Sequence, residues 1–228
     1  RVMATTALVA AASSAMAAEI AIIGGMNSDQ FWNKIKKGVD DARLIVEANG
    51  GKVDYLRMQS YDNFAADAAD IIRVAISQHP DGIAVPDWVY ESQDPAIQEA
   101  IAAGIKVILF NAGTIDKARE LGAINYIGSD EYIAGKAGGD QLVKLGAKKG
   151  VCINTLPGTA NIEARCQGMI DAMTAEMKKA LGSDELKAAW AGLGANPPNL
   201  WGPDFGRFVG SEVKRWAEVV KGSGAKLD

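Results

Sequence analysis

Polar and aromatic residues stand directly after several short apolar runs of this sequence, and their side chains suit the binding of a hydroxylated ligand. Aromatic rings cover the apolar CH faces of a sugar ring, while Asp, Asn and Arg side chains take its hydroxyls in paired hydrogen bonds. These positions hold no nucleophile with an adjacent base, so the pattern predicts non-covalent binding and no catalytic residue. The candidates are Asn27, Phe31 and Trp32 after residues 19–24, Asp62 after 53–58, Asp87 after 83–85, and Asn111 after 106–110.

Most of these residues also have a purely structural interpretation, which the sequence leaves open. Phe31 heads the apolar face of a helix and could belong to the core, whereas Trp32 falls on a different helical face and is the better stacking platform. Asp62 directly precedes a helix and could cap it. Asn27 and Asn111 could serve only to form turns. Asp87, between a proline and a tryptophan after a buried run, is the strongest single candidate.

Composition excludes several classes of function. The 228 residues are 48% hydrophobic and 23% charged, with a net charge of −4, as in an ordinary globular protein. A nucleic-acid partner is not expected, because such proteins need a cationic surface. One histidine and two cysteines are too few for a zinc site and leave little for histidine-based catalysis. No dinucleotide, P-loop, G-x-S-x-G or H-E-x-x-H motif is present, so we expect no enzyme, no cofactor and no metal.

Apolar runs alternate with amphipathic stretches along most of the chain, which predicts an α/β fold with a parallel sheet covered by helices on both faces. In such a sheet ligands bind at the carboxyl ends of the strands, where the candidate residues stand. Strands are predicted at 19–24, 53–58, 83–85, 106–110, 123–127 and 150–155, and helices at 31–46, 64–76, 95–103, 131–145, 162–181 and around 209–220.

The pattern divides the chain into four parts. Residues 1–17 hold one Arg, an apolar run and small residues in A-x-A spacing, which is typical of the remnant of a secretory signal peptide and predicts export to the bacterial periplasm; an alanine-rich tail is the alternative. We expect an N-terminal α/β lobe over 18–126, a partial, truncated second α/β lobe over 127–182, and a helical segment of different origin over 183–228.

Five segments stand together in an order that is typical of one known family. They are EIAIIGGMNSDQFWNKIKKGVDDA (19–42), SQHPDGIAVPDWV (77–89), AIQEAIAAGIKVILFNAG (96–113), NYIGSDEYIAGKAGGD (125–140) and INTLPGTANIEARCQGM (153–169). Over residues 19 to about 180 the chain resembles the type I periplasmic sugar-binding proteins, the ribose-binding-like receptors of ABC importers. The resemblance implies a periplasmic binding protein-like I fold whose two lobes close on a sugar-like ligand.

The resemblance also implies site residues and partners. Its ligand contacts fall on Asn27, Phe31, Trp32, Asp87 and Asn111, and on Arg165 at a helix start, with Asn161 and Glu163 as equal candidates there. The implied ligand is a sugar or polyol, and the implied protein partner is the membrane permease of an ABC importer. We expect the receptor to be a monomer. A transcription regulator with the same fold is disfavoured by the acidic balance and by the absence of a helix-turn-helix.

Residues 186–228 instead resemble the C-terminal segment of receptors for tripartite tricarboxylate transporters. The chain would then be composite, and two alternative functions follow: a carboxylate receptor of such a transporter, or a non-functional composite chain.

The two cysteines, Cys152 and Cys166, enclose a loop that spans 15 residues. In an exported protein a disulfide there would contribute ~3 kcal/mol. Two buried thiols are the alternative, because a strand and the following helix can hold the Cα atoms too far apart.

Overall fold

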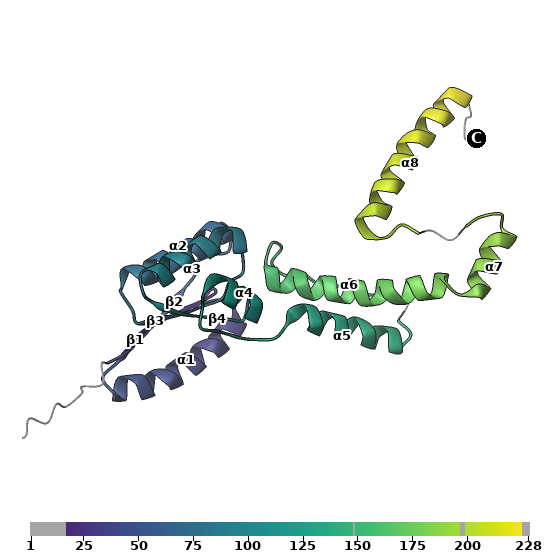
Figure 1. Cartoon of the computed structure of the whole chain (residues 1–228). Helices are drawn as coiled ribbons and strands as arrows, with labels where there is room; N and C mark the ends of the chain where they lie inside the picture. Colours follow the sequence, from purple (N-terminus) through teal and green to yellow (C-terminus); the bar gives the residue numbers. More distant parts are fainter. Residues whose placement is uncertain (1–16, 148, 197–198, 225–228) are drawn as a thin grey trace, which may run out of the picture. The chain divides into compact units, whose positions relative to one another are not determined.

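The computed structural model describes residues 17–147, 149–196 and 199–224 (Figure 1). They divide into two compact units, one formed by residues 1–132 and 153–165 and the other by residues 133–152 and 166–228. The predicted signal remnant, residues 1–17, lies outside the described residues except for its last position. None of the described helices combines the length and apolar character that a membrane span requires. The predicted domain boundaries at 126 and 182 remain predictions.

The first unit is built on a five-stranded parallel sheet with the strand order β2-β1-β3-β4-β5. The strands are β1 (Glu19–Gly24), β2 (Lys52–Arg57), β3 (Gly82–Val85), β4 (Lys106–Phe110) and β5 (Asn125–Ile127). Four helices follow the strands: α1 (Gln30–Ala48), α2 (Phe64–Ser77), α3 (Tyr90–Ala102) and α4 (Ile115–Leu121). The predicted α/β class with a parallel sheet is confirmed.

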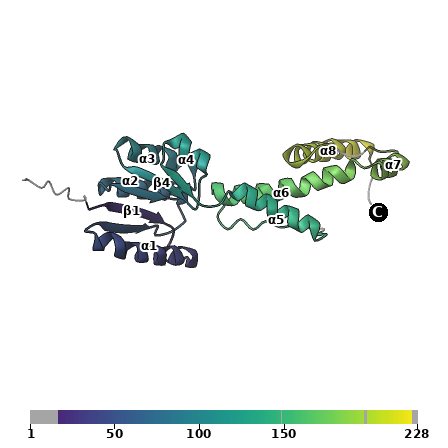
Figure 2. The ribbon, with the colours of Figure 1, turned by 60° about the horizontal axis from the view of Figure 1, so that its bottom comes forward.

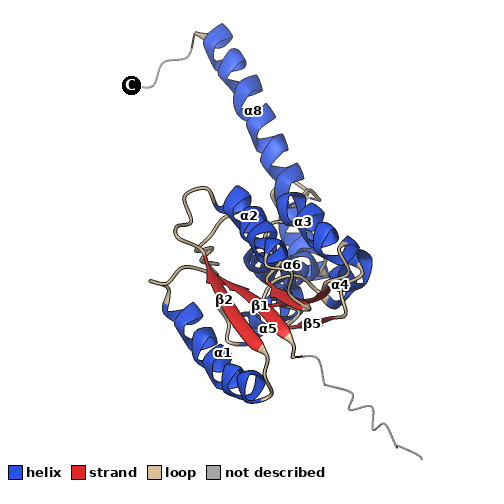
Figure 3. Ribbon diagram, turned by 90° about the vertical axis from the view of Figure 1, so that its left-hand side faces the viewer, coloured by secondary structure: helices blue, strands red, loops and turns tan. Residues whose placement is uncertain are grey.

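The helices cover both faces of this sheet. Helix α1 lies on one side of β1, and α2 and α3 lie together on the other side (Figures 2 and 3). The main core fills the space between the sheet and its helices with fully buried aliphatic side chains, among them Ile23, Ile72, Ile83, Ile97 and Leu109. Burial of these residues fixes the strands and therefore the positions of the loops at their carboxyl ends.

A second, aromatic cluster lies at the carboxyl ends of the strands. Its buried members are Trp32, Met58, Ala68, Trp88 and Ala112. Each lies in a loop or near the start of a helix that follows a strand. Because β1, β2, β3 and β4 are parallel, their carboxyl ends lie at one end of the sheet, and these residues lie there too. This cluster is the floor on which the candidate site is built.

The second unit is helical over its described residues. It contains most of α5 (Glu131–Lys144) and of α6 (Ala160–Leu181), together with α7 (Asp184–Gly192) and α8 (Gly202–Ser223). Helices α5 and α6 approach closely at Gly139, where an added Cβ would lie 2.7 Å from the Ala172 Cβ. A side chain at this position would therefore force the two helices apart.

The strand predicted over residues 150–155 is wrong. The structure has no strand there, and Val151 and Ile153 are exposed. A strand needs a neighbour to accept its backbone hydrogen bonds, and no strand among the described residues pairs with this segment. The segment instead runs as an irregular connection into α6.

Candidate functional site

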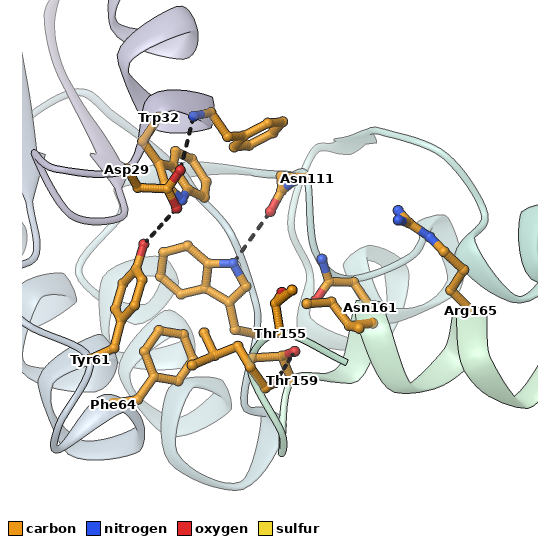
Figure 4. Close-up of a pocket in the computed structure, with 13 residues that line it drawn as sticks. Asp29, Trp32, Tyr61, Phe64, Asn111, Thr155, Thr159, Asn161 and Arg165 are labelled. Carbon is orange, nitrogen blue, oxygen red and sulfur yellow. Dashed lines mark hydrogen bonds between the residues drawn. The ribbon is translucent and has the colours of Figure 1, made fainter. Parts of the chain in front are cut away.

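A cavity of about 450 Å³ opens at the carboxyl ends of the strands of the first unit (Figure 4). Aromatic residues form part of its wall, and amide, hydroxyl and charged side chains form the rest. Five of the predicted site residues line it: Phe31, Trp32, Asn111, Asn161 and Arg165. The other lining residues are Asp29, Tyr61, Phe64, Trp88, Thr155, Leu156, Thr159 and Ile162.

The aromatic wall is a chain of ring contacts, of which three are edge-to-face and one, between Phe64 and Trp88, is tilted. The Trp32 ring contacts the Trp88 ring at a centroid distance of 5.5 Å and an angle of 87°, and the Phe31 ring at 5.1 Å and 90°. Phe64 lies 5.3 Å from Trp88 and 5.4 Å from Tyr61. Such contacts favour particular orientations of the rings.

Exposure reverses the predicted order of Phe31 and Trp32 as stacking platforms. Trp32 is only 5% exposed because its ring fills the aromatic cluster, whereas Phe31 is 49% exposed. The sequence suggested that Phe31 could be core, since it begins the apolar spacing of α1. Phe31 is the second residue of α1, and its half-exposed ring lines the cavity.

Asp29 anchors the start of α1 at the cavity. Its Oδ1 accepts the backbone N–H of Phe31 at 2.9 Å, and its Oδ2 accepts the Tyr61 hydroxyl at 3.3 Å. The Tyr61 oxygen in turn accepts the N–H of Met26 at 3.0 Å. Burial, more than any other cause, raises the pKa of Tyr61 above its ordinary value. The phenol is therefore a neutral donor that ties the first two loops together.

Asn111 presents an amide at the end of β4. Its backbone φ is +63°, a left-handed conformation that Asn tolerates better than most residues. The Trp88 indole N–H donates to its Oδ1 at 3.3 Å. That contact fixes which end of the amide faces the indole and directs the Nδ2 group elsewhere, as a donor available at the cavity wall.

Residues 155–165 close the polar side of the cavity. The N–H of Ala160 donates to the Trp88 carbonyl at 2.8 Å, which joins this segment to the loop after β3. The Oδ1 atom of Asn161 is buried without a hydrogen-bond partner among the described residues. A buried acceptor of this kind costs free energy unless a donor reaches it.

Arg165 lines the cavity with its charge already compensated. Its Nε–H donates to Glu131 Oε2 at 2.6 Å, and Glu131 also accepts the Ser129 hydroxyl on Oε1 at 2.6 Å. Glu131 is 8% exposed, so its carboxylate depends on these two donors for solvation. The arginine is therefore held as a hydrogen-bond donor rather than as a free cation.

Three predicted site residues do not line this cavity. Asn27 and Asp62 are exposed, and the N–H of Asp62 donates to the Ser60 hydroxyl. Asp62 does not cap α2 either, because the capping position belongs to Asn63, which makes no side-chain cap. Asp87 is fully buried. Its N–H donates to the Ala112 carbonyl, and its carboxyl faces Asp94 on α3 rather than the cavity.

Cys152 and Cys166 form a disulfide with a Cα–Cα distance of 5.5 Å. The bridge joins the two ends of the segment that supplies Thr155, Leu156, Thr159, Asn161, Ile162 and Arg165 to the cavity. It therefore restricts the very residues that form the polar side of the wall.

Sequence reasoning missed eight lining residues for two reasons. Asp29, Tyr61 and Trp88 lie in the same post-strand loops as the predicted residues, and Phe64 begins the helix after one of these loops. Residue type alone did not distinguish them from their neighbours as lining residues. Thr155, Leu156, Thr159 and Ile162 follow no strand in the structure, so the rule of strand ends could not find them.

Comparison with known proteins identifies the family. Residues 20–192 match the family described as periplasmic binding protein domain. The chain belongs to the periplasmic binding proteins. Within the described residues, no group of three or more His, Cys, Asp or Glu side chains could hold a metal ion. The relatives of this periplasmic binding protein are solute-binding proteins rather than enzymes.

Two similar proteins are associated with a sugar or a polyol. The xylose/arabinose-binding protein of Sulfolobus acidocaldarius is 28% identical over 160 residues, 66% of this chain and 38% of that protein. The solved structure of a carbohydrate transporter from Acidothermus cellulolyticus 11B, in complex with myo-inositol, is 35% identical with a TM-score of 0.60, over 68% of this chain and 52% of that chain.

A further solved structure supports the fold alone. The periplasmic sugar-binding protein of an ABC sugar transporter from Legionella pneumophila is 21% identical with a TM-score of 0.61, over 70% of this chain and 57% of that chain. The present chain thus spans little more than half the length of these structures and less of the Sulfolobus protein.

Proposed function

We propose that this periplasmic binding protein is a solute receptor that binds a neutral sugar or polyol without covalent chemistry and delivers it to the permease of an ABC importer. The observation that carries the proposal is the cavity wall of the first unit. It combines a half-exposed ring, Phe31, with a buried unpaired acceptor, Asn161 Oδ1, and a compensated arginine. A ring for CH faces and separate polar atoms for hydroxyls are what a polyol requires.

The charge of the wall supports a neutral ligand over a carboxylate. Arg165 is the one cation among the described residues that line the cavity, and Glu131 already holds it. Asp29 adds a negative charge. A dicarboxylate would have to separate the Arg165–Glu131 pair and would leave the largely buried Glu131 without its partner, which is costly. The resemblance of residues 186–228 to tripartite tricarboxylate transporter receptors therefore remains a prediction that this wall does not favour.

The relatives support the ligand class. The Sulfolobus relative is named as a xylose/arabinose-binding protein, and the Acidothermus relative was solved in complex with myo-inositol. We propose export to the periplasm, where a solute receptor must act. Closure of a second lobe over the sugar would provide the signal to the permease, because a ligand shifts an equilibrium only through its differential affinity for the two states.

Calorimetric titration of the full chain with myo-inositol, D-xylose, L-arabinose, L-rhamnose and succinate tests the proposal. We expect heat from at least one neutral ligand, none from succinate, and a change in the fluorescence of Trp32 or Trp88. Asn161→Leu should abolish binding, since it removes the acceptor. Gln98→Leu, at an exposed position on α3, is the matched control and should bind as the wild type does. Binding of succinate alone, or of none of the five compounds, would refute the proposal.

A further inference from the structure

Two carboxyl groups next to the cavity carry oxygens that are buried without a partner. Both carboxyl oxygens of Asp87 and the Oδ1 atom of Asp94 lack a hydrogen-bond partner among the described residues. Asp87 is 0% exposed. The other oxygen of Asp94 accepts from Lys117 Nζ at 3.1 Å. Neither carboxyl lines the cavity, and binding of a polyol does not use either group.

The pair is unstable if both groups are ionised. The Asp94 carboxyl faces Asp87 within hydrogen-bonding reach, and two carboxylates at that separation repel each other strongly in a buried site. Lys117 supplies one positive charge, and its ammonium also lies 4.5 Å from the centre of the Tyr90 ring. Lys117 Nζ also donates to Glu120 Oε1 at 3.1 Å. Its single positive charge is therefore shared by Asp94 and Glu120, and Asp87 needs a proton.

The surroundings assign the proton to Asp87. Burial is the main cause that raises the pKa of Asp87 to about 8, and the neighbouring Asp94 is the next. The other charged group that raises it is Glu120 on α4, while Lys117 acts in the opposite direction. The Tyr90 phenol stays neutral, since burial raises its pKa above the ordinary value. Asp94 accepts from Lys117 Nζ at 3.1 Å, so its oxygens are the acceptors of the pair.

We propose that Asp87 and Asp94 share one proton, donated by Asp87 to Asp94 Oδ1, and that this hydrogen bond positions the loop that carries Trp88 into the sugar site. The backbone links are short. The N–H of Asp87 donates to the Ala112 carbonyl at 3.2 Å. The carbonyl of the following residue, Trp88, accepts the N–H of Ala160 at 2.8 Å. Asp87 is thus a positioning residue. Its effect on the ligand rests on the proposed function, but the shared proton does not.

The sign of the pH dependence follows from the linkage between protonation and folding. The ordinary value for Asp87 is 3.8 and the folded value is about 8. Between these limits the folded protein holds a proton that the unfolded chain releases. The contribution of Asp87 to the stability of the fold therefore decreases as the pH rises from about 4 to about 8, and it levels off above that range.

Asp87→Asn tests the inference, because an amide keeps a donor toward Asp94 and cannot ionise. Melting temperatures and urea unfolding of the full chain are measured from pH 5 to pH 9. The unfolding equilibrium constant of the wild type relative to Asp87→Asn should rise by up to about tenfold per pH unit below pH 8. Asp116→Asn, an 86% exposed aspartate on α4, is the control and should follow the wild type. The infrared carbonyl band of a protonated carboxylic acid should be present at neutral pH and absent from Asp87→Asn.

Two further measurements test the shared proton: the acid band of Asp94→Asn and the pH dependence of sugar affinity. Asp94→Asn can still accept from Lys117 and can donate to Asp87, so the acid band should disappear at a lower pH than in the wild type. If Asp87→Asn reproduces the pH profile of the wild type, or if no acid band exists at neutral pH, the shared proton is refuted. The affinity for the responding sugar should fall above pH 8 in the wild type and stay constant in Asp87→Asn. A confirmed proton without any sugar binding would refute the proposed function alone.

Discussion

Phe31→Ala is expected to weaken sugar binding with little effect on folding, because the Phe31 ring is 49% exposed. An aromatic side chain buries about 200 Å² when it is fully covered, so a stacked sugar can cover about half of this area, or about 100 Å². At ~25 cal/mol per Å² the ring contributes at most about 2.5 kcal/mol to binding. The dissociation constant should then rise by up to ~70-fold.

Trp32→Ala gives the opposite result, because Trp32 is 5% exposed and fills the aromatic cluster. We expect it to lower the free energy of unfolding by about 3–5 kcal/mol. Calorimetry with the responding sugar measures affinity, and urea denaturation measures stability. Phe208→Ala is a matched control, since Phe208 is 45% exposed on α8 outside the cavity. Unchanged affinity of Phe31→Ala, or a loss of stability as large as that of Trp32→Ala, would show that Phe31 is a core residue and not a stacking platform.

Three further variants test how the wall is held. Replacing Cys152 and Cys166 together by Ser should lower the free energy of unfolding by ~3 kcal/mol and weaken sugar binding, and urea denaturation of this variant should no longer respond to dithiothreitol. Glu131→Gln leaves Arg165 uncompensated, so calorimetry should detect heat from succinate, which the wild type does not give; no heat from succinate would contradict the role assigned to the pair. Gln93→Leu removes three hydrogen bonds to the loop of Trp88 and should cost about 3–5 kcal/mol by urea denaturation; a loss below ~1 kcal/mol would show that the loop is held by other contacts.

The parallel sheet could be predicted because the apolar spacing of the single segments and the packing of the whole sheet require the same arrangement. The apolar spacing of α1 and the buried runs of β1 and β4 each require a covered face, and one parallel sheet with helices on both sides covers all of them. Helix α4 escaped prediction because seven residues are too few to establish a period. Its ends were nevertheless encoded, by Thr114, which accepts the Lys117 N–H, and by Gly122 with φ of +84°. The segment 150–155 has the apolar composition of a strand, but no strand among the described residues pairs with it.

The site could be predicted only in part, because a strand end fixes where a loop begins and not where each side chain points. Phe31 and Trp32 are adjacent in sequence, yet one is exposed and the other is buried, since α1 turns one of them toward the cluster. The segment 155–165, whose ends are closed by the disulfide, is held to the first unit by the backbone contact from Ala160 to Trp88 and by the Arg165–Glu131 pair. Both are tertiary contacts, which no spacing within the segment encodes.

Asp87 is of a residue type that suits a sugar site, but in the structure its side chain does not face the cavity. A carboxylate after a buried strand suits a sugar hydroxyl, and the sequence offers no reason to prefer another partner. In the structure the Asp87 side chain faces Asp94 on α3, seven residues later in the chain, and Lys117 on α4 donates to that Asp94. Burial then decides its chemistry: a charge that water would solvate at the cavity becomes a proton donor inside the fold. The group that looked like a ligand contact therefore acts one residue away from the ligand, through Trp88.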